Sequence, residues 1–241
     1  MAKLITGSGT SEHKVVTAQE WRKARLEFLQ KEKEFTKLRD ELSWQRRNLP
    51  WEKVEKTYVV DGPQGKESLS DLFAGKSQLV VYHFMFAPEA TQGCVACSFM
   101  ADNFNEIVIH LKQRDVTMLA ISLAPLEKLE AFKKRMGWSF KWVSSGQNDF
   151  NYDFHVSFHP EELANGTAQY NYDKVETKNP NREGVSVFYK DEHGDIYHTY
   201  SSYSRGLDML MTAYHYLDLV PKGRDEQPDT HWLKFHDKYS E

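Results

Sequence analysis

A narrow stripe of apolar side chains on a strongly polar background marks the first fifty residues. The apolar positions recur every seven residues, at Trp21, Phe28, Phe35 and Leu42. This spacing is close to two turns of an α-helix, so the stripe follows one side of a helix. Thr17 and Glu20 have the spacing of a capping box, which satisfies free amides at a helix start. The pattern predicts a long helix that begins after Thr17 and ends before Pro50, because proline lacks an amide hydrogen.

This helix is the main part of a predicted N-terminal helical arm at residues 1–54. Two interpretations fit its apolar stripe. The arm either lies across its own domain or pairs with the same helix of a second chain, which would make the protein a homodimer. Lys31 and Gln45 stand where a coiled coil needs apolar side chains, which counts against the second interpretation.

From residue 55 onward the pattern changes to short apolar runs separated by turns. Residues 58–60 predict a strand, and residues 69–73 predict a short helical turn. Residues 78–86 form a nearly continuous apolar run, as expected for a strand buried on both faces. Apolar positions at helical spacing follow over residues 98–113, and residues 116–121 form another buried run. These segments predict a strand, a helix and a second strand parallel to the first.

The second half of this region adds two helices and a hairpin. Residues 126–136 place their apolar positions on one face of a helix that Gly137 ends. Residues 184–190 and 196–200 flank a short polar turn, as expected for an antiparallel hairpin. A last helix is predicted over about residues 207–217. The order β-α-β-α-β-β-α predicts an α/β fold with a mixed sheet flanked by helices.

A long stretch with little periodicity interrupts this order. Residues 142–182 are rich in Asn, Gly, Tyr and Asp, and an irregular segment of this length is usually a functional loop or an insertion. The sequence therefore predicts one domain at residues 55–220 with a long insertion near residues 142–182. A C-terminal tail follows at residues 221–241.

Composition and charge exclude several classes of protein. Of the 241 residues, 40% are hydrophobic, which is enough for a core, and 31 basic against 35 acidic side chains disfavour a nucleic-acid binder. The longest apolar run, residues 79–87, is less than half as long as a membrane-spanning helix needs. The N-terminus has no pattern of a secretory signal. We expect a cytoplasmic protein that binds neither nucleic acid nor a membrane.

The candidate chemistry lies in two cysteines. Cys94 and Cys97 are three residues apart, between the buried strand and the following predicted helix. Free amides and the dipole at a helix start favour an anionic sulfur, so Cys94 is the expected nucleophile. Cys97 follows about one turn later, where it can resolve a mixed disulfide or close a ring with Cys94. The pattern predicts a redox-active disulfide and an enzyme that performs thiol–disulfide exchange.

Several runs of sequence resemble one family. The runs are residues 46–51, 82–86, 93–94, 116–117, 133–138, 140–145 and 149–154. Over about residues 21–239 the chain resembles the domain-of-unknown-function 899 (DUF899) family, described as dithiol-disulfide oxidoreductases with a thioredoxin-like fold. The resemblance implies a thioredoxin-like mixed sheet. It also implies a disulfide-containing protein or a small-molecule thiol as the substrate. We expect no cofactor.

Likeness to related redox proteins suggests two further site residues. The buried acid that thioredoxins carry beneath their cysteines falls near His83, whose imidazole can exchange a proton with Cys97. A plain core histidine is the competing interpretation. Thr91, three residues before Cys94, resembles the threonine of the peroxiredoxin signature, so a peroxiredoxin-like peroxidase is a further alternative.

Other features concern substrate binding and redox potential. Tyr152 and Phe154 belong to an aromatic cluster in the long insertion, which either packs in the core or walls a substrate pocket beside the cysteines. Gly93 stands where thioredoxins have a tryptophan. Gly184 lies near the strand start where thioredoxins have a cis-proline. The redox potential of thioredoxin therefore does not transfer to this chain.

A metal site is the alternative to thiol exchange. Cys94, Cys97 and His83 offer two thiolates and an imidazole, which suit copper or zinc. A closed zinc site needs a fourth ligand, and thioredoxin-like copper chaperones generally have one more residue between their cysteines. The sequence thus leaves a metal-binding or copper-delivery protein as a second hypothesis.

Overall fold

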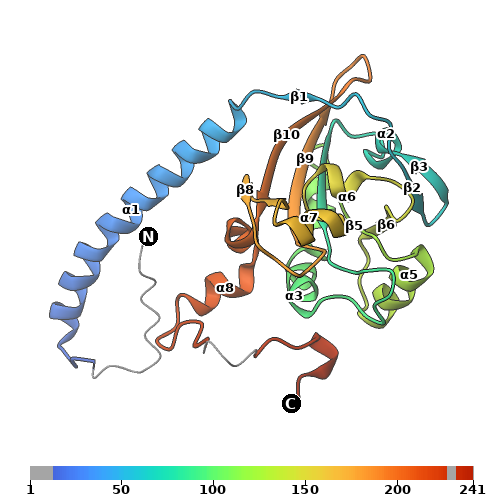
Figure 1. The fold of residues 1–241 in the computed structure, drawn as a ribbon. Helices are drawn as coiled ribbons and strands as arrows, with labels where there is room; N and C mark the ends of the chain where they lie inside the picture. The colour runs from blue at the N-terminus through green and yellow to red at the C-terminus, as the bar shows by residue number, and fades with distance from the viewer. Residues whose placement is uncertain (1–12, 227–231, 241) are drawn as a thin grey trace.

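The computed structural model describes residues 13–226 and 232–240, which form the fold shown in Figure 1. Within these residues, one sheet has the strand order β1-β10-β9-β4-β5-β6-β2-β3. The strands of this sheet are Glu52–Lys53 (β1), Val59–Gly62 (β2), Gly65–Ser68 (β3), Gln78–His83 (β4), Val116–Ser122 (β5), Lys141–Ser144 (β6), Gly184–Lys190 (β9) and Ile196–Tyr203 (β10). A separate small ribbon consists of Gln169–Tyr170 (β7) and Asp173–Lys174 (β8).

The helices connect and cover these strands. They are Ala18–Arg47 (α1), Leu69–Leu72 (α2), Val95–Phe104 (α3), Val108–Lys112 (α4), Leu126–Arg135 (α5), Phe150–Asp153 (α6), Pro160–Asn165 (α7) and Thr212–Leu217 (α8). Two 3₁₀-helices are Ser204–Leu210 (η1), directly after β10, and His236–Lys238 (η2), within the C-terminal tail.

The central strands have the directions that the predicted order requires. β4, β5 and β6 are parallel, while β9 is antiparallel to β4 and β10 is antiparallel to β9. α3 lies between β4 and β5 along the chain, and α5 lies between β5 and β6. The prediction of a thioredoxin-like mixed sheet flanked by helices is confirmed. β1 extends this sheet at one end, and β2 and β3 extend it at the other.

β4 is buried on both faces, which explains its nearly continuous apolar sequence. Successive side chains of a strand point to opposite faces. Val81 belongs to a core with residues of α2 and α6, whereas Tyr82 belongs to a core that contains Cys97 of α3 and Phe132 of α5. His83 continues the first of these two faces, because its ring stacks against Phe150. Neighbouring residues of β4 therefore serve two separate cores.

The predicted N-terminal helix is confirmed. Thr17 and Glu20 form both hydrogen bonds of the capping box, and none of the residues of α1 is buried. Figure 1 shows α1 extending away from the sheet, and the Arg46 guanidinium near its end lies 4.9 Å from the centre of the Tyr200 ring on β10. The helix does not lie across the sheet, and its pairing with a second chain stays a prediction.

Among the described residues, no helix combines the length and the apolar character that crossing a membrane requires.

Two predicted helices are interrupted. The helix predicted at residues 98–113 is divided into α3 and α4, because residues 105–107 form a turn between them. The Asn105 side-chain oxygen accepts a hydrogen bond from the backbone amide of Ser139 at 2.7 Å, which ties the turn to the loop before β6. The helix predicted at about residues 207–217 is divided into η1 and α8 at Met211, whose ψ of 86° is not helical.

The C-terminal tail returns to the domain. Phe235 is 6% exposed, and its ring centre lies 5.5 Å from that of Phe132 on α5. Asp237 forms an ion pair with Arg135 of the same helix at 2.8 Å. The end of the chain thus packs against the same face of the sheet as α3 and α5.

A row of hydrogen-bonded polar side chains crosses the opposite face. His83 Nε2 lies 2.9 Å from Ser186 Oγ on β9, which lies 2.9 Å from Ser201 Oγ on β10. Ser201 Oγ lies 2.7 Å from His198 Nε2. His83 is 1% exposed, and burial lowers its pKa to about 3, so the ring is neutral at physiological pH.

The neutral, buried state of His83 makes folding sensitive to acid. Between about pH 6 and pH 4 the unfolded chain binds a proton at this histidine and the folded chain does not. The free energy of unfolding should therefore fall as the pH is lowered. We expect this fall to be shallower in His83→Gln by up to about 1.4 kcal/mol per pH unit.

Urea unfolding at a series of pH values measures this difference. His193→Gln is the matched control, because the His193 side chain is 78% exposed and its loss should leave the wild-type slope unchanged. Equal slopes for wild type and His83→Gln would contradict the prediction.

Candidate functional site

The two cysteines lie where β4 passes into α3. Cys94 is the N-cap residue of α3, and Cys97 lies in its first turn. The Cys94 amide donates to the Met85 carbonyl at 3.1 Å, and the Met85 amide donates to Cys97 Sγ at 3.5 Å. Met85 follows β4 by two residues, so the end of this strand fixes both cysteines.

Position 93, directly before the first cysteine, has no room for a side chain, so it requires glycine. A Cβ atom at this position would lie 2.6 Å from the Phe84 ring and 3.0 Å from the Phe132 ring. A larger side chain therefore does not fit here unless both rings move. This crowding explains why the position that holds tryptophan in thioredoxins holds glycine in this chain.

Two cationic side chains of α5 hold the loop before the cysteines. Lys128 Nζ donates to the backbone carbonyls of Pro88 at 2.6 Å and Ala90 at 3.1 Å. Arg135 Nη1 donates to Gln92 Oε1 at 3.2 Å. These contacts fix the loop that precedes Cys94.

The environment gives the two thiols opposite acidities. A hydrogen bond from Cys97 is the largest influence on Cys94, and together with the backbone amides of Ala96 and Cys97 it lowers the pKa of Cys94 to about 7 against the opposing effect of burial. Cys97 is 1% exposed, and burial raises its pKa well above the ordinary value. At neutral pH, half-buried Cys94 is partly thiolate while Cys97 keeps its proton.

Tyr82 is the polar side chain that faces Cys97 from beneath. It is 1% exposed, and burial raises the pKa of its hydroxyl far above the ordinary value, so the hydroxyl keeps its proton. A hydrogen bond from this hydroxyl acts on Cys97 in the direction that lowers the thiol pKa. Tyr82 thus provides a hydrogen-bond donor for a thiolate that forms on Cys97.

Glu183 is the acidic group that influences both Cys94 and Tyr82. It directly precedes β9, and its negative charge acts to raise the pKa of Cys94 and of Tyr82. The lowered pKa of Cys94 therefore arises from hydrogen bonds, which outweigh this charge and the burial of the sulfur.

The other predicted site residues lie in different places relative to the cysteines. His83 lies on the opposite face of the sheet, where it bonds Ser186, so its predicted proton exchange with Cys97 has no contact to support it. Phe154 is buried on that face, with its ring centre 6.1 Å from that of His83. Tyr152 stacks on His159 at 4.2 Å, and Thr91 is exposed in the loop before Cys94.

The alternative metal site is not assembled. Cys94, Cys97 and His83 are divided between the two faces of β4, as the packing of Tyr82 and His83 into separate cores shows. Within residues 13–226 and 232–240, no three His, Cys, Asp or Glu side chains are grouped so that they could hold a metal ion.

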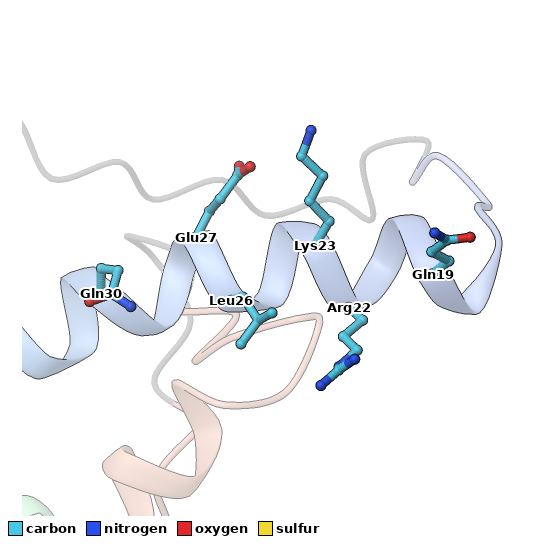
Figure 2. A pocket seen from close by; sticks show the side chains of 6 residues that line it. All are labelled: Gln19, Arg22, Lys23, Leu26, Glu27 and Gln30. Atoms are coloured by element: carbon cyan, nitrogen blue, oxygen red, sulfur yellow. The ribbon is translucent and has the colours of Figure 1, made fainter.

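Two hollows on the surface of the described residues lie away from the cysteines. One of about 460 Å³ is lined by Gln19, Arg22, Lys23, Leu26, Glu27 and Gln30, and Figure 2 shows that all six project from α1. Another of about 610 Å³ lies between α3, α8 and the C-terminal tail and includes Phe99 and Trp232. Because the first is lined by a single helix, it lacks the converging groups of a catalytic site.

Tyr82 and Glu183 are the two site residues that sequence reasoning missed. The alternation of side chains along β4 was the available signal, because it places adjacent residues on opposite faces. Both faces of this strand are apolar, so the pattern does not show which face carries the cysteines. The position of Glu183 depends on the pairing of β9 with β4, for which the local sequence contains no signal.

Comparisons with known proteins give fold likeness at low identity. Peroxidoxin BcpB from Mycobacterium tuberculosis is 14% identical with a TM-score of 0.45, over 67% of this chain and 93% of that one. A Xanthomonas campestris peroxiredoxin Q structure is 12% identical with a TM-score of 0.45, over 70% and 91% of the two chains. The yeast mitochondrial 1-Cys peroxiredoxin is 15% identical with a TM-score of 0.43, over 70% and 78%.

A comparison with curated proteins finds no match. A family model does match, over residues 10–239, and it covers both cysteines, the sheet and the N-terminal helix. The chain belongs to the DUF899 family, described as bacterial proteins of unknown function.

Proposed function

We propose that this protein is a dithiol-disulfide oxidoreductase in which Cys94 is the nucleophile and Cys97 is the resolving thiol. The observation that carries this proposal is the opposite acidity of the two thiols at the start of α3. The pKa of Cys94 is lowered to about 7, while burial raises the pKa of Cys97. Thiol exchange needs this difference, because one sulfur must attack as an anion while the other waits as a thiol.

The first step is attack on a substrate disulfide. The Cys94 thiolate bonds to one sulfur of the substrate, and the other substrate sulfur leaves as a thiolate that takes a proton from water. Cys94 is suited to this step because it is only half-buried and its anion accepts hydrogen bonds from Cys97 and from amides of α3. The product is a mixed disulfide between Cys94 and the substrate.

The second step releases the substrate. Once Cys94 is bound in a mixed disulfide, its negative charge no longer holds the proton of Cys97. Cys97 gives this proton to water and its thiolate bonds to Cys94 Sγ. The bond between Cys94 and the substrate sulfur breaks, and the substrate leaves as a thiolate that takes a proton from water. Two electrons pass from the two cysteines to the substrate, and a Cys94–Cys97 disulfide remains.

Tyr82 assists the second step as a positioning residue. Its hydroxyl stays protonated and donates a hydrogen bond toward Cys97, which stabilises the thiolate of Cys97 as it forms in the apolar core. This role replaces the one that the sequence suggested for His83.

The substrate class follows from the surface position of Cys94. We assign a disulfide-containing protein or a small disulfide as the oxidised substrate, because both present an exposed sulfur–sulfur bond to a half-buried nucleophile. The cytoplasm is the proposed compartment, since its reducing systems return the resulting disulfide to two thiols.

The acidity of Cys94 tests the proposal directly. Ultraviolet thiolate absorbance of the reduced protein should titrate with a midpoint at about 7. Cys97→Ser keeps a hydrogen-bond donor and should hold the midpoint below the ordinary value. Cys97→Ala loses the donor and should raise the midpoint toward about 8.5. A midpoint in Cys97→Ala equal to that of wild type would contradict the assigned hydrogen bond.

Trapping of the mixed disulfide tests the order of attack. Cys97→Ser should accumulate an adduct on Cys94 when treated with a small disulfide, because the resolving thiol is absent. Cys94→Ser is the matched control and should form no adduct, because Cys97 is buried. Mass spectrometry reads both outcomes. Absence of the adduct in Cys97→Ser would overturn the proposal, and the same assay with hydrogen peroxide tests the peroxidase alternative.

Tyr82→Phe should slow only the second step. Loss of a hydrogen bond worth about 1 kcal/mol should lower the rate of substrate release about fivefold. The thiolate titration of Cys94 should stay at the wild-type midpoint. Stopped-flow kinetics measures the release rate, and Tyr203→Phe is the control because its hydroxyl bonds the Phe154 carbonyl in another part of the fold. A release rate unchanged by Tyr82→Phe would exclude this role.

A further inference from the structure

The row of polar side chains across the face opposite the cysteines reaches from the core to the surface. Its inner end is His83, which is 1% exposed. Its outer end is His198, whose side chain is 18% exposed and whose Nδ1 lies 3.5 Å from Glu52 Oε2 on β1. Ser186 and Ser201 join the two histidines, and both serines are buried. The row thus joins an exposed carboxylate to a buried imidazole.

The outer end of the row opens into a surface groove. The groove has a volume of about 470 Å³ and is lined by Leu49 and Pro50 after α1, Tyr172 of the β7–β8 turn, and residues 198–202 of β10. His198 and Ser201 are among its lining residues. Water in this groove therefore meets the outer member of the row, His198.

Two arrangements of the row keep both serine protons within it. Each serine hydroxyl has one proton, so in these arrangements it donates to one neighbour and accepts from the other. If neutral His198 directs its Nδ1 proton to Glu52, its Nε2 accepts from Ser201, and both hydroxyls point toward His198. His83 then donates from Nε2 to Ser186, and its Nδ1 carries no proton.

The structure agrees with this first arrangement. His83 Nδ1 is a buried atom without a hydrogen-bond partner among the described residues. A buried ring nitrogen without a hydrogen-bond partner costs less free energy when it carries no proton than when it is an N–H donor.

Protonation of His198 requires the second arrangement. Charged His198 takes one proton from water and then donates from both ring nitrogens, to Glu52 and to Ser201. Ser201 must then donate to Ser186, and Ser186 must donate to His83 Nε2. His83 stays neutral only with its proton on Nδ1, the ring nitrogen that has no hydrogen-bond partner among the described residues.

We propose that His198, Ser201, Ser186 and His83 form one proton-linked unit, in which the charge of His198 at the groove sets which ring nitrogen of buried His83 carries the proton. The two states differ by one proton, and only hydrogen atoms change place along the row. The unit is separate from the thiol chemistry. His83 nevertheless ends β4 two residues before Met85, which bonds both cysteines.

The groups around the two histidines determine that His198, and not His83, takes up the additional proton. Burial lowers the pKa of His198, while Glu52 from β1 and the backbone of Tyr200 act in the opposite direction and favour a proton. Phe154 of α6 and Phe188 of β9 contact His198 and carry no charge. His83 faces only neutral groups, the rings of Phe150 and Phe154, Ser186 and Asn151, apart from the charge that His198 acquires.

Nitrogen NMR of histidine side chains tests the unit, because the shift of each ring nitrogen reports whether it carries a proton. In the wild-type protein, titrated from mildly alkaline to mildly acidic pH, the Nδ1 and Nε2 shifts of His83 should interchange with the same midpoint as His198. In Ser201→Ala, His198 should still titrate and His83 should keep one tautomer. Ser202→Ala is the matched control on the adjacent residue and should keep the interchange.

Glu52→Gln provides a second measurement that does not depend on a buried substitution. The Glu52 side chain is 81% exposed, so the variant should fold as wild type does. Loss of the carboxylate should lower the midpoint of His198, and the His83 midpoint should move by the same amount. His83 shifts that stay constant in wild type while His198 titrates, or that move independently of His198 in Glu52→Gln, would overturn the proposal.

Discussion

The hydrogen bond from Cys97 to Cys94 is the interaction on which the chemistry of this site depends. It is the largest influence that lowers the pKa of Cys94, and it acts against both burial and the charge of Glu183. It requires that Cys97 keep its proton, which the apolar core ensures because burial disfavours the thiolate. The core that packs α3 against the sheet therefore also sets the acidity of the half-buried Cys94 sulfur.

β4 connects this site to the rest of the fold. Val80 and Tyr82 belong to the core that contains Cys97, while His83 faces the opposite core and the row of serines. Met85, just beyond the strand, bonds both cysteines. One strand thus supports a thiol pair on one side and a neutral polar row on the other, and the alternation of its side chains keeps these two groups apart.

The polar row and the thiol pair illustrate two solutions to the burial of titratable groups. Burial without a charged partner lowers the pKa of His83 to about 3, so the ring stays neutral and is satisfied by a serine hydroxyl. Cys94 is only half-buried, and its anion is stabilised by donors at a helix start. The difference follows from solvent access and from the donors that each position offers.

The sequence by itself determined the long capped helix, the β-α-β-α-β-β-α order and the place of the cysteines at a strand-to-helix corner. These features depend on local signals, namely periodicity, caps and turn residues, which act between near neighbours. The tertiary structure decided that Tyr82 and not His83 packs in the core with Cys97, and that Phe154 is buried in the opposite core. Both faces of β4 are apolar, so only the packing of α3 onto one of them determines which residues meet the thiols.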